Sequence, residues 1–462
     1  MVRGSLARRA YSTLSPAAGR AFASSATPAE KSLDEAVSSS FKASDLQVVR
    51  CGGDQRLPEN LDDLKFGSVF SPHVLSVRHS NDKGWEAPIV KPLENLSIHP
   101  SAPVFHYGVG CFEGMKAYAS KKKEGDILLF RPDMNMKRFA LSMSRLCLPS
   151  FDTDELLGCL KRLLDVDKSF VPRKPGFSIY IRPLAIGITA TLGVAPASHS
   201  EISIMMCPVG PYYPGGLVPI DILLDESKVR AFPGGTGQYK IGGNYAPTLF
   251  DLKSAAEDHG CKQVLYTMPT GSPTEEGGER VVAECGAMNM FFLLQHAGEP
   301  FSPLPLLPPP SSSLSLFPSL SFHVCDCSFC SLWLTWFVFF VFAGGEVELA
   351  TPPLDGTILA GVTRDTILEL CRGFGTLTVS ERTITTAELE RHASQGTLLE
   401  IFGSGTACII QPVKRLVRKN GEALSTRRDT PKEDMVSEQV YKAITDIQYG
   451  RIDHPWAQSI YS

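Results

Sequence analysis

Residues 234–247 read GGTGQYKIGGNYAP, a stretch with five glycines, two tyrosines and a single lysine, Lys240. Glycine is favoured where the backbone must adopt a positive φ or pass close to another group, and elsewhere it costs conformational order. A lysine among such residues is therefore expected to lie in a tight, shaped loop. The pattern from Pro247 to Gly260 predicts that a helix follows this loop directly.

The composition indicates a globular protein with room for two domains. The chain has 462 residues, of which 43% are hydrophobic and 20% are charged, so it can bury two cores. Its formal net charge of -4 gives no basic excess for binding a phosphate backbone. Nucleic acid is therefore not an expected partner.

The amino-terminal segment has the composition of a targeting sequence. Residues 1–30 carry four arginines among serines and alanines, with no acidic residue before Glu30. Such a segment is typical of an organelle transit peptide. We expect a mitochondrial address, with a plastid address less favoured and a disordered basic tail as the alternative.

Residues 300–345 differ from the rest of the chain. Their first half is rich in proline and serine, and residues 328–343 form an uncharged apolar and aromatic run. The run is shorter than the roughly 20 residues of a membrane-spanning helix, although extension upstream makes it long enough. One interpretation is therefore a membrane-inserted segment.

A metal site and a foreign insertion are the other two interpretations of this segment. Residues 323–330 contain one histidine and three cysteines, but the second ligand pair of a strong zinc signature is missing, so we predict no metal. Joining Glu299 directly to Val347 gives a strand, a turn and a second strand of ordinary length. We therefore favour a translated non-coding stretch or a splice variant.

Helices and strands alternate on both sides of this segment. Residues 126–132 have a strand pattern, and residues 361–375 have a helical one. Another helix is predicted where apolar residues recur at helical spacing, at Met136, Phe139, Ala140, Met143 and Leu146. The predicted organisation is a smaller amino-terminal α/β domain over 31–209, a Pro/Gly connector over 210–219 and a larger carboxyl-terminal domain over 220–462, interrupted by 300–345.

The chemistry expected of Lys240 requires further groups. A lysine amine becomes a nucleophile toward carbonyl groups when burial or a cation lowers its pKa, and its commonest use is a covalent link to pyridoxal phosphate. Such a site also needs a phosphate anchor, a carboxylate for the ring nitrogen and apolar walls. Candidates are the helix start at Val362 and Thr363, the small-residue turn at 402–407, Arg138 and Glu284. Each alone also fits an ordinary loop, and their coincidence favours catalysis.

A series of motifs between residues 60 and 450 follows the order of one enzyme family. They are FHYGVGCFEGMKAY (105–118), FRPDMNMKR (130–138), YIRP (180–183), GGTGQYKIGGNY (234–245), Glu284 with Met288 and Asn289, TPPLDG followed by GVTRD, and FGSGTA (402–407). In these motifs the chain resembles the branched-chain amino acid aminotransferases of the class IV pyridoxal-phosphate fold. The resemblance implies a two-domain α/β (α+β) fold, with the larger, carboxyl-terminal domain binding the cofactor.

The resemblance implies a role for each matching residue around pyridoxal 5'-phosphate. Lys240 is implied to hold the cofactor covalently and to carry the proton between substrate and cofactor. Glu284 is implied to pair with the ring nitrogen and keep it protonated. The phosphate is implied to contact Arg138, Val362, Thr363 and Thr406, and the ring oxygen to contact Tyr245.

The resemblance also implies the reaction. This is a reversible transfer of the amino group between leucine, isoleucine or valine and 2-oxoglutarate, which yields branched-chain 2-oxo acids and glutamate. Aromatic walls suit the aliphatic side chains, turn N–H groups suit the α-carboxylate, and Arg182 suits the distal carboxylate of glutamate. The implied substrate residues are Tyr107, Phe112, Tyr180, Arg182, Thr406 and Ala407.

Two other functions stay open on the sequence. The insertion would make this polypeptide an inactive or membrane-retained isoform if its apolar run is translated. A D-amino acid aminotransferase or an aminodeoxychorismate lyase of the same fold is the nearer rival, which the long amino-terminal region disfavours. The resemblance also implies a homodimer with its active site near the subunit interface.

Overall fold

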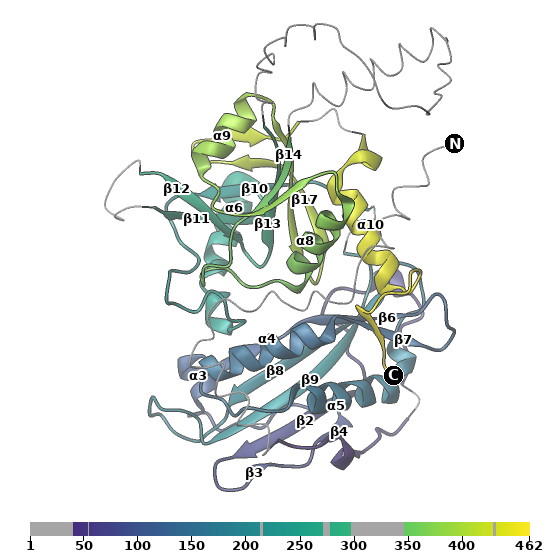
Figure 1. Ribbon diagram of the computed structural model, residues 1–462. Helices are drawn as coiled ribbons and strands as arrows, with labels where there is room; N and C mark the ends of the chain where they lie inside the picture. The colour runs from purple at the N-terminus through teal and green to yellow at the C-terminus, as the bar shows by residue number, and fades with distance from the viewer. Residues whose placement is uncertain (1–39, 54, 213–215, 271–277, 297–345, 428–430) are drawn as a thin grey trace, which may run out of the picture.

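The computed structural model describes residues 40–53, 55–212, 216–270, 278–296, 346–427 and 431–462. These residues form two mixed sheets, each with its own helices; in Figure 1 the purple and blue amino-terminal part lies below the green and yellow part. The predicted transit peptide at 1–30 and the insertion at 300–345, with its histidine and cysteines, lie outside the described residues.

The first sheet has ten strands. Its order is β1-β4-β2-β9-β8-β6-β7-β19, with β3 paired to β2 and β5 paired to β8. The strands are β1 (Gln47–Val48), β2 (His73–Ser80), β3 (Gly84–Trp85), β4 (Ile89–Pro92), β5 (Gly110–Phe112), β6 (Met115–Ala119), β7 (Ile127–Phe130), β8 (Ser178–Gly187), β9 (His199–Val209) and β19 (Ala457–Ser459).

The first sheet is covered by helices α3 (Pro103–Tyr107), α4 (Pro132–Arg145) and α5 (Thr153–Val166). The spacing that predicted α4 is confirmed, because Met136, Phe139, Ala140 and Met143 are all buried. They pack in the same core as the apolar face of α5. Asp152 caps α5 by accepting hydrogen bonds from the first N–H groups of the helix.

The second sheet has nine strands, in the order β12-β11-β10-β17-β16-β13-β14-β15, with β18 paired to β17. Residues 281–294 belong to two strands that occupy different places in this sheet. The strands are β10 (Ile220–Asp225), β11 (Gln263–Pro269), β12 (Arg280–Cys285), β13 (Asn289–Gln295), β14 (Val347–Thr351), β15 (Thr378–Glu381), β16 (Leu398–Gly405), β17 (Ile409–Val417) and β18 (Ala423–Ser425).

Among the described residues, four α-helices accompany the second sheet: α6 (Thr248–His259), α8 (Val362–Phe374), α9 (Thr386–Ser394) and α10 (Val436–Gln448). The predicted end of α6 is confirmed, because Gly260 adopts the left-handed conformation with φ 65°. The predicted α8 is confirmed as well, and Ile367, Leu370 and Cys371 are buried on its inner face.

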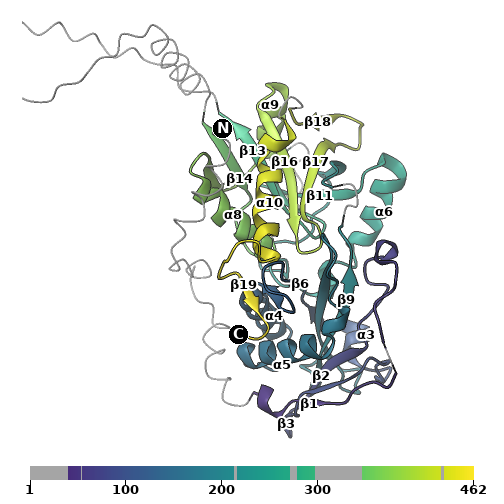
Figure 2. The same ribbon diagram turned by 90° about the vertical axis from the view of Figure 1, so that its right-hand side faces the viewer.

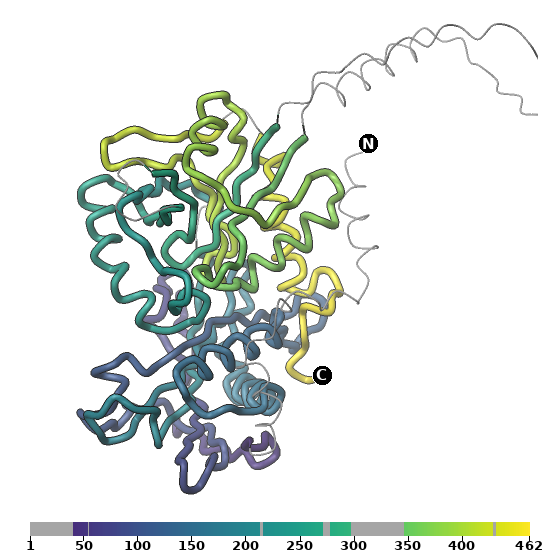
Figure 3. The backbone as a smooth tube through the Cα atoms, turned by 60° about the vertical axis from the view of Figure 1, so that its left-hand side comes forward, coloured from purple at the N-terminus to yellow at the C-terminus, as the bar shows by residue number. Residues whose placement is uncertain are grey.

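The carboxyl-terminal tail links the two sheets. After α10, which packs beside α8 in the second half of the molecule, the chain returns to the first sheet and adds β19 antiparallel to β7. Figures 2 and 3 show this yellow segment running from the upper half into the lower half. Residues distant in sequence therefore complete the amino-terminal sheet.

The strands that flank the predicted insertion are neighbours in a hairpin. β13 and β14 pair antiparallel up to Gln295 and Val347, and the N–H of His296 donates to the carbonyl of Glu346 at 2.9 Å. Within the described ranges, no helix is long and apolar enough to cross a membrane. The same ranges contain no group of three His, Cys, Asp or Glu side chains that could hold a metal ion.

Candidate active site

The lysine loop lies where the two halves of the molecule meet. A Cβ atom on Gly237 would lie 2.4 Å from the carbonyl oxygen of Thr357, so glycine permits this close approach. The N–H of Lys240 donates to Ser142 Oγ on α4 at 2.9 Å, and the N–H of Phe112 donates to the Lys240 carbonyl at 3.0 Å. The first half of the molecule thus fixes the backbone of a loop that belongs to the second.

The amine of Lys240 is enclosed by aromatic rings. Its Nζ lies 3.4 Å from the hydroxyl of Tyr245 and 5.0 Å from the ring centre of Phe112. Burial lowers the pKa of Lys240 to about 8, and the positive charge of Arg138 acts in the same direction. Near neutral pH a larger fraction of this amine than of an exposed lysine is therefore neutral, and thus nucleophilic.

Glu284 lies at the end of β12 and is 2% exposed. Its Oε2 accepts a hydrogen bond from the N–H of Leu359 at 3.1 Å and forms an ion pair with Arg230. Burial raises the pKa of Glu284, and the Arg230 guanidinium opposes this effect. Both interactions fall on Oε2, which leaves Oε1 as the oxygen available to a ligand.

Three of the four residues predicted to bind a phosphate lie together. Val362, Thr363 and Thr406 all line one small cavity of about 20 Å³. Val362 and Thr363 begin α8, and no side chain caps the helix at Gly361, so its first N–H groups are available to an anion. A Cβ on Gly361 would lie 2.1 Å from Asn289 Oδ1, so the approach to this helix requires glycine.

Arg138 lies beside the same helix start but also holds a carboxylate. Its Nη1 donates to the carbonyl of Ala360 at 2.8 Å, while Nε and Nη2 form a bidentate pair with Glu113 at 2.8 and 2.5 Å. Glu113 is fully buried, and the Arg138 guanidinium lowers its pKa against the effect of burial. A guanidinium has five N–H donors, so two remain for a ligand.

The predicted substrate residues Phe112, Tyr180 and Arg182 form one cluster. The Arg182 guanidinium lies 4.8 Å from the ring centre of Phe112 and 5.2 Å from that of Tyr180, and it donates to the Tyr180 hydroxyl at 3.0 Å. The Phe112 ring also lies 5.1 Å from the ring of Tyr245. Arg182 Nε is buried without a partner among the described residues, which suits an arginine that meets a carboxylate ligand.

The turn at Thr406 and Ala407 is held from the first sheet. Thr406 Oγ1 donates to the carbonyl of Gly114 at 3.2 Å, and the amine of Lys116 donates to the carbonyl of Ala407 at 2.8 Å. Lys116 is 8% exposed, and burial lowers its pKa to about 8. A buried cation therefore fixes the turn expected to bind the α-carboxylate.

Tyr107 does not join this cluster in the single chain. It ends α3, is 44% exposed, and its hydroxyl donates to the carbonyl of Leu192 in the loop after β8. None of the contacts that join Lys240, Phe112, Tyr180 and Arg182 includes it.

Three charged residues that organise this site were not expected from the sequence: Glu113, Lys116 and Arg230. The first two stand in the quoted motif FEGMKA, and both are buried charges within a strand region of apolar residues. Arg230 precedes the glycine-rich loop in VRAF. A lone charge between apolar residues was the available signal, since buried charges are rare unless they are paired.

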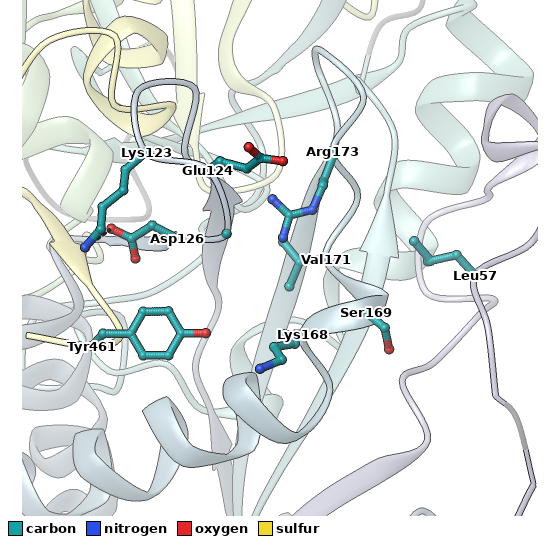
Figure 4. A pocket seen from close by; sticks show the side chains of 10 residues that line it. Leu57, Lys123, Glu124, Asp126, Lys168, Ser169, Val171, Arg173 and Tyr461 are labelled. Carbon is teal, nitrogen blue, oxygen red and sulfur yellow. Dashed lines mark ion pairs between the residues drawn. The ribbon is translucent and has the colours of Figure 1, made fainter.

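A larger hollow of about 690 Å³ lies elsewhere, on the first half of the molecule (Figure 4). Lys123 and Asp126 follow β6 there, and Lys123 Nζ lies 3.9 Å from Asp126 Oδ2. They line the hollow together with Lys168, Arg173 and Tyr461. None of the predicted site residues lines this hollow.

Comparisons with known proteins agree with this geometry. Residues 110–416 match the family described as amino-transferase class IV. The mitochondrial branched-chain-amino-acid aminotransferase of Rattus norvegicus is 37% identical, covering 91% of this chain and 92% of the relative. The cytosolic enzyme of Mus musculus is 36% identical over 91% of this chain and 94% of its own.

Solved structures with the same fold include two branched-chain amino acid aminotransferases. The Escherichia coli structure has a TM-score of 0.56 at 20% identity and covers 84% of this chain and 99% of its own. The Thermobaculum terrenum enzyme, solved in its PLP form, has a TM-score of 0.56 at 19% identity, covering 85% and 99%. The predicted class IV fold with two domains is confirmed.

Proposed function

Because the chain belongs to the branched-chain-amino-acid aminotransferases of class IV, we propose that it exchanges an amino group between leucine, isoleucine or valine and 2-oxoglutarate. It is a pyridoxal-phosphate-dependent enzyme, and its products are branched-chain 2-oxo acids and glutamate. The observation that supports this most is the buried amine of Lys240, which lies 3.4 Å from the Tyr245 hydroxyl; burial, and after it the charge of Arg138, lowers its pKa to about 8.

The residues present fit the cofactor at each of its polar ends. The uncapped start of α8 and the free N–H donors of Arg138 suit a phosphate. Glu284 Oε1 suits a protonated ring nitrogen, and the aromatic rings of Phe112 and Tyr245 suit an apolar ring system. Val362, Thr363 and Thr406 would complete the phosphate contacts. Pyridoxal phosphate, when bound, supplies the electron-withdrawing ring that stabilises negative charge at the substrate α-carbon.

Lys240 is assigned as the base and acid of the reaction. Its lowered pKa lets Nζ accept a proton from the substrate α-carbon and release it again near neutral pH. Burial raises the pKa of Tyr245, so its hydroxyl remains protonated 3.4 Å from Nζ and orients the amine.

The substrate contacts are assigned to two groups. Phe112 and Tyr180 form an aromatic wall for an aliphatic side chain, while Arg182 binds the distal carboxylate of glutamate or 2-oxoglutarate. The N–H groups of the Thr406–Ala407 turn bind the α-carboxylate, with Lys116 holding the turn in place.

An absorption spectrum tests the central assignment. Purified protein with pyridoxal phosphate is expected to show the band of the lysine-bound cofactor, and leucine should convert that band, while Lys240→Ala lacks it. D-alanine and aminodeoxychorismate serve as controls for the two rival class IV activities and should leave the band unchanged. A folded, soluble wild type without the band would overturn the function.

The role of Arg182 is tested by separating the two substrates. Arg182→Leu should raise KM for 2-oxoglutarate about 100-fold, because a charge-assisted contact to its distal carboxylate is lost. KM for leucine, which has no distal carboxylate, should change less than threefold. Equal changes for both substrates would contradict this assignment.

A homodimer is proposed from the exposed apolar side chains on α3 and the loop after β8. Phe105 is 60% exposed, Leu192 64% and Val194 83%, and the Tyr107 hydroxyl joins the two segments. An apolar patch of this kind is typical of an interface, and Tyr107 would then serve the partner's active site. Val194→Asp should yield monomers in sedimentation and lose activity, whereas Val49→Asp, at another exposed valine, should do neither.

A mitochondrial location is proposed from the composition of residues 1–30 alone, because mitochondrial and cytosolic relatives match equally well. Residues 1–39 fused to a fluorescent protein should be imported into mitochondria. Replacing Arg8 and Arg9 by glutamate should prevent import. Fluorescence of the unaltered fusion protein in plastids or in the cytosol would contradict the proposal.

A further inference from the structure

We propose that Arg230 is a positioning residue for Glu284, which it orients and keeps ionised so that the ring nitrogen of the bound cofactor retains its proton. The inference rests on the proposed function. It concerns a residue that contacts neither substrate nor cofactor in the assignment above.

Arg230 lies at the point where three segments converge. It follows β10, its side chain is 2% exposed, and its Nη2 donates to the carbonyls of Gly237 at 3.1 Å and Thr357 at 3.0 Å. The same nitrogen forms the ion pair with Glu284. One side chain therefore ties the lysine loop, the segment before α8 and the strand that carries the carboxylate.

This arrangement selects one oxygen of the carboxylate. Arg230 and the N–H of Leu359 both occupy Glu284 Oε2, from the side chain of one segment and the backbone of another. Two donors on one oxygen restrict rotation of the carboxylate and direct Oε1 to the ligand. A carboxylate held by only one of them would be free to turn.

The charges around Glu284 also support a role for Arg230. Glu284 is 2% exposed, and burial raises its pKa, so an unpaired carboxylate here would take up a proton. Among the charges that lower this pKa, Arg230 has the largest effect, followed by Lys240 and then Arg138. A protonated Glu284 could no longer stabilise a proton on the ring nitrogen.

The test is a pH titration of the holoenzyme absorption band in wild type, Arg230→Met, Arg230→Lys and Arg382→Met. Loss of the ring-nitrogen proton makes the linkage nitrogen at Lys240 more basic. In Arg230→Met the band should therefore titrate about 1 pH unit higher than in wild type, the usual effect of one nearby charge. Arg230→Lys retains the positive charge, so its band should titrate at nearly the same pH as in wild type.

Arg382→Met is the matched control for the loss of an arginine ion pair. Arg382 pairs with Glu348 and Glu388, which are not among the site residues, so its variant should titrate like wild type even if it is less stable. If Arg230→Met does not fold, Arg230→Lys still decides the point. A lysine variant with wild-type pH dependence and at least tenfold weaker cofactor binding supports orientation by the guanidinium, whose Nη2 also contacts the carbonyls of Gly237 and Thr357.

The outcomes separate this inference from the proposed function. A wild type without a leucine-sensitive band overturns both. A wild type with the band, beside Arg230 variants whose titration and cofactor dissociation constants equal those of wild type, overturns only the role of Arg230.

Discussion

At the scale of single residues, the site depends on how buried charges are paired. Lys240, Tyr245, Glu284 and Arg138 were expected from the sequence, but two of them depend on a neighbour that was not: Arg230 holds Glu284, and Glu113 holds Arg138. Buried charges persist only when they are paired and hydrogen-bonded. The partners are thus as necessary to the site as the groups that meet the ligand.

The lowered pKa of Lys240 predicts the pH dependence of cofactor capture. The neutral amine is the nucleophile, so the rate at which the apo protein binds pyridoxal covalently should rise with pH and reach half its maximum near pH 8. Stopped-flow absorbance between pH 6 and 11 measures it, with Lys240→Ala as the blank. A midpoint near 10.4, the value of an exposed lysine, would contradict the burial of this amine.

The Glu113–Arg138 pair predicts a large loss of stability when one partner is neutralised. Glu113→Gln leaves a buried guanidinium uncompensated and should lower the free energy of unfolding by about 3 kcal/mol. Urea unfolding of the apo protein measures this. Glu94→Gln breaks the exposed pair with Lys91 and should leave the midpoint unchanged; equal effects of the two variants would show that the buried pair contributes nothing.

At the scale of elements, contacts between α4 and α8 connect the two halves of the molecule. Arg138 on α4 reaches the carbonyl of Ala360 just before α8, and Arg131, which precedes α4, donates to Thr366 at 2.9 Å and to Asp365 at 2.6 Å on α8. Arg131, just before α4, and Arg138, within it, therefore fix the helix whose start is proposed to bind the phosphate.

The hairpin of β13 and β14 predicts that residues 300–346 can be removed. Gln295 and Val347 are paired partners, so joining Glu299 to Val347 leaves a four-residue loop, an ordinary hairpin length. The shortened protein should bind pyridoxal phosphate and transaminate leucine at least as well as the full chain, and should yield more soluble protein. Loss of cofactor binding on deletion would show that this segment belongs to the working enzyme.

At the scale of the whole molecule, the carboxyl-terminal tail couples the halves. β19 completes the first sheet beside β7, Ile460 is buried in the first core, and Arg131 lies 4.5 Å from the ring centre of Trp456. Arg131 also forms an ion pair with Asp365 on α8. The tail therefore supports α8, the helix whose start is proposed to bind the phosphate, without reaching the site.

Truncation after Asp453 tests this coupling. Loss of β19 and Trp456 frees one side of Arg131, so the dissociation constant of pyridoxal phosphate should rise about tenfold, equivalent to about 1.4 kcal/mol. Fluorescence titration of the apo protein measures it. Tyr461→Ala, which alters only an exposed ring of the tail, is the control, and unchanged cofactor affinity after truncation would refute the coupling.

The sequence by itself determined the class of chemistry and the local elements. A lysine in a glycine-rich loop and the order of the motifs indicated the family. Apolar spacing located α4 and α8, and Pro247 and Gly260 located α6, because helical periodicity and helix ends are encoded by neighbouring residues. Only the tertiary structure joined Arg230 to Glu284, Glu113 to Arg138 and β19 to β7, and separated Tyr107 from Lys240. These relations connect residues far apart in the chain, and no local pattern encodes which buried charge will meet which partner once the two cores have packed.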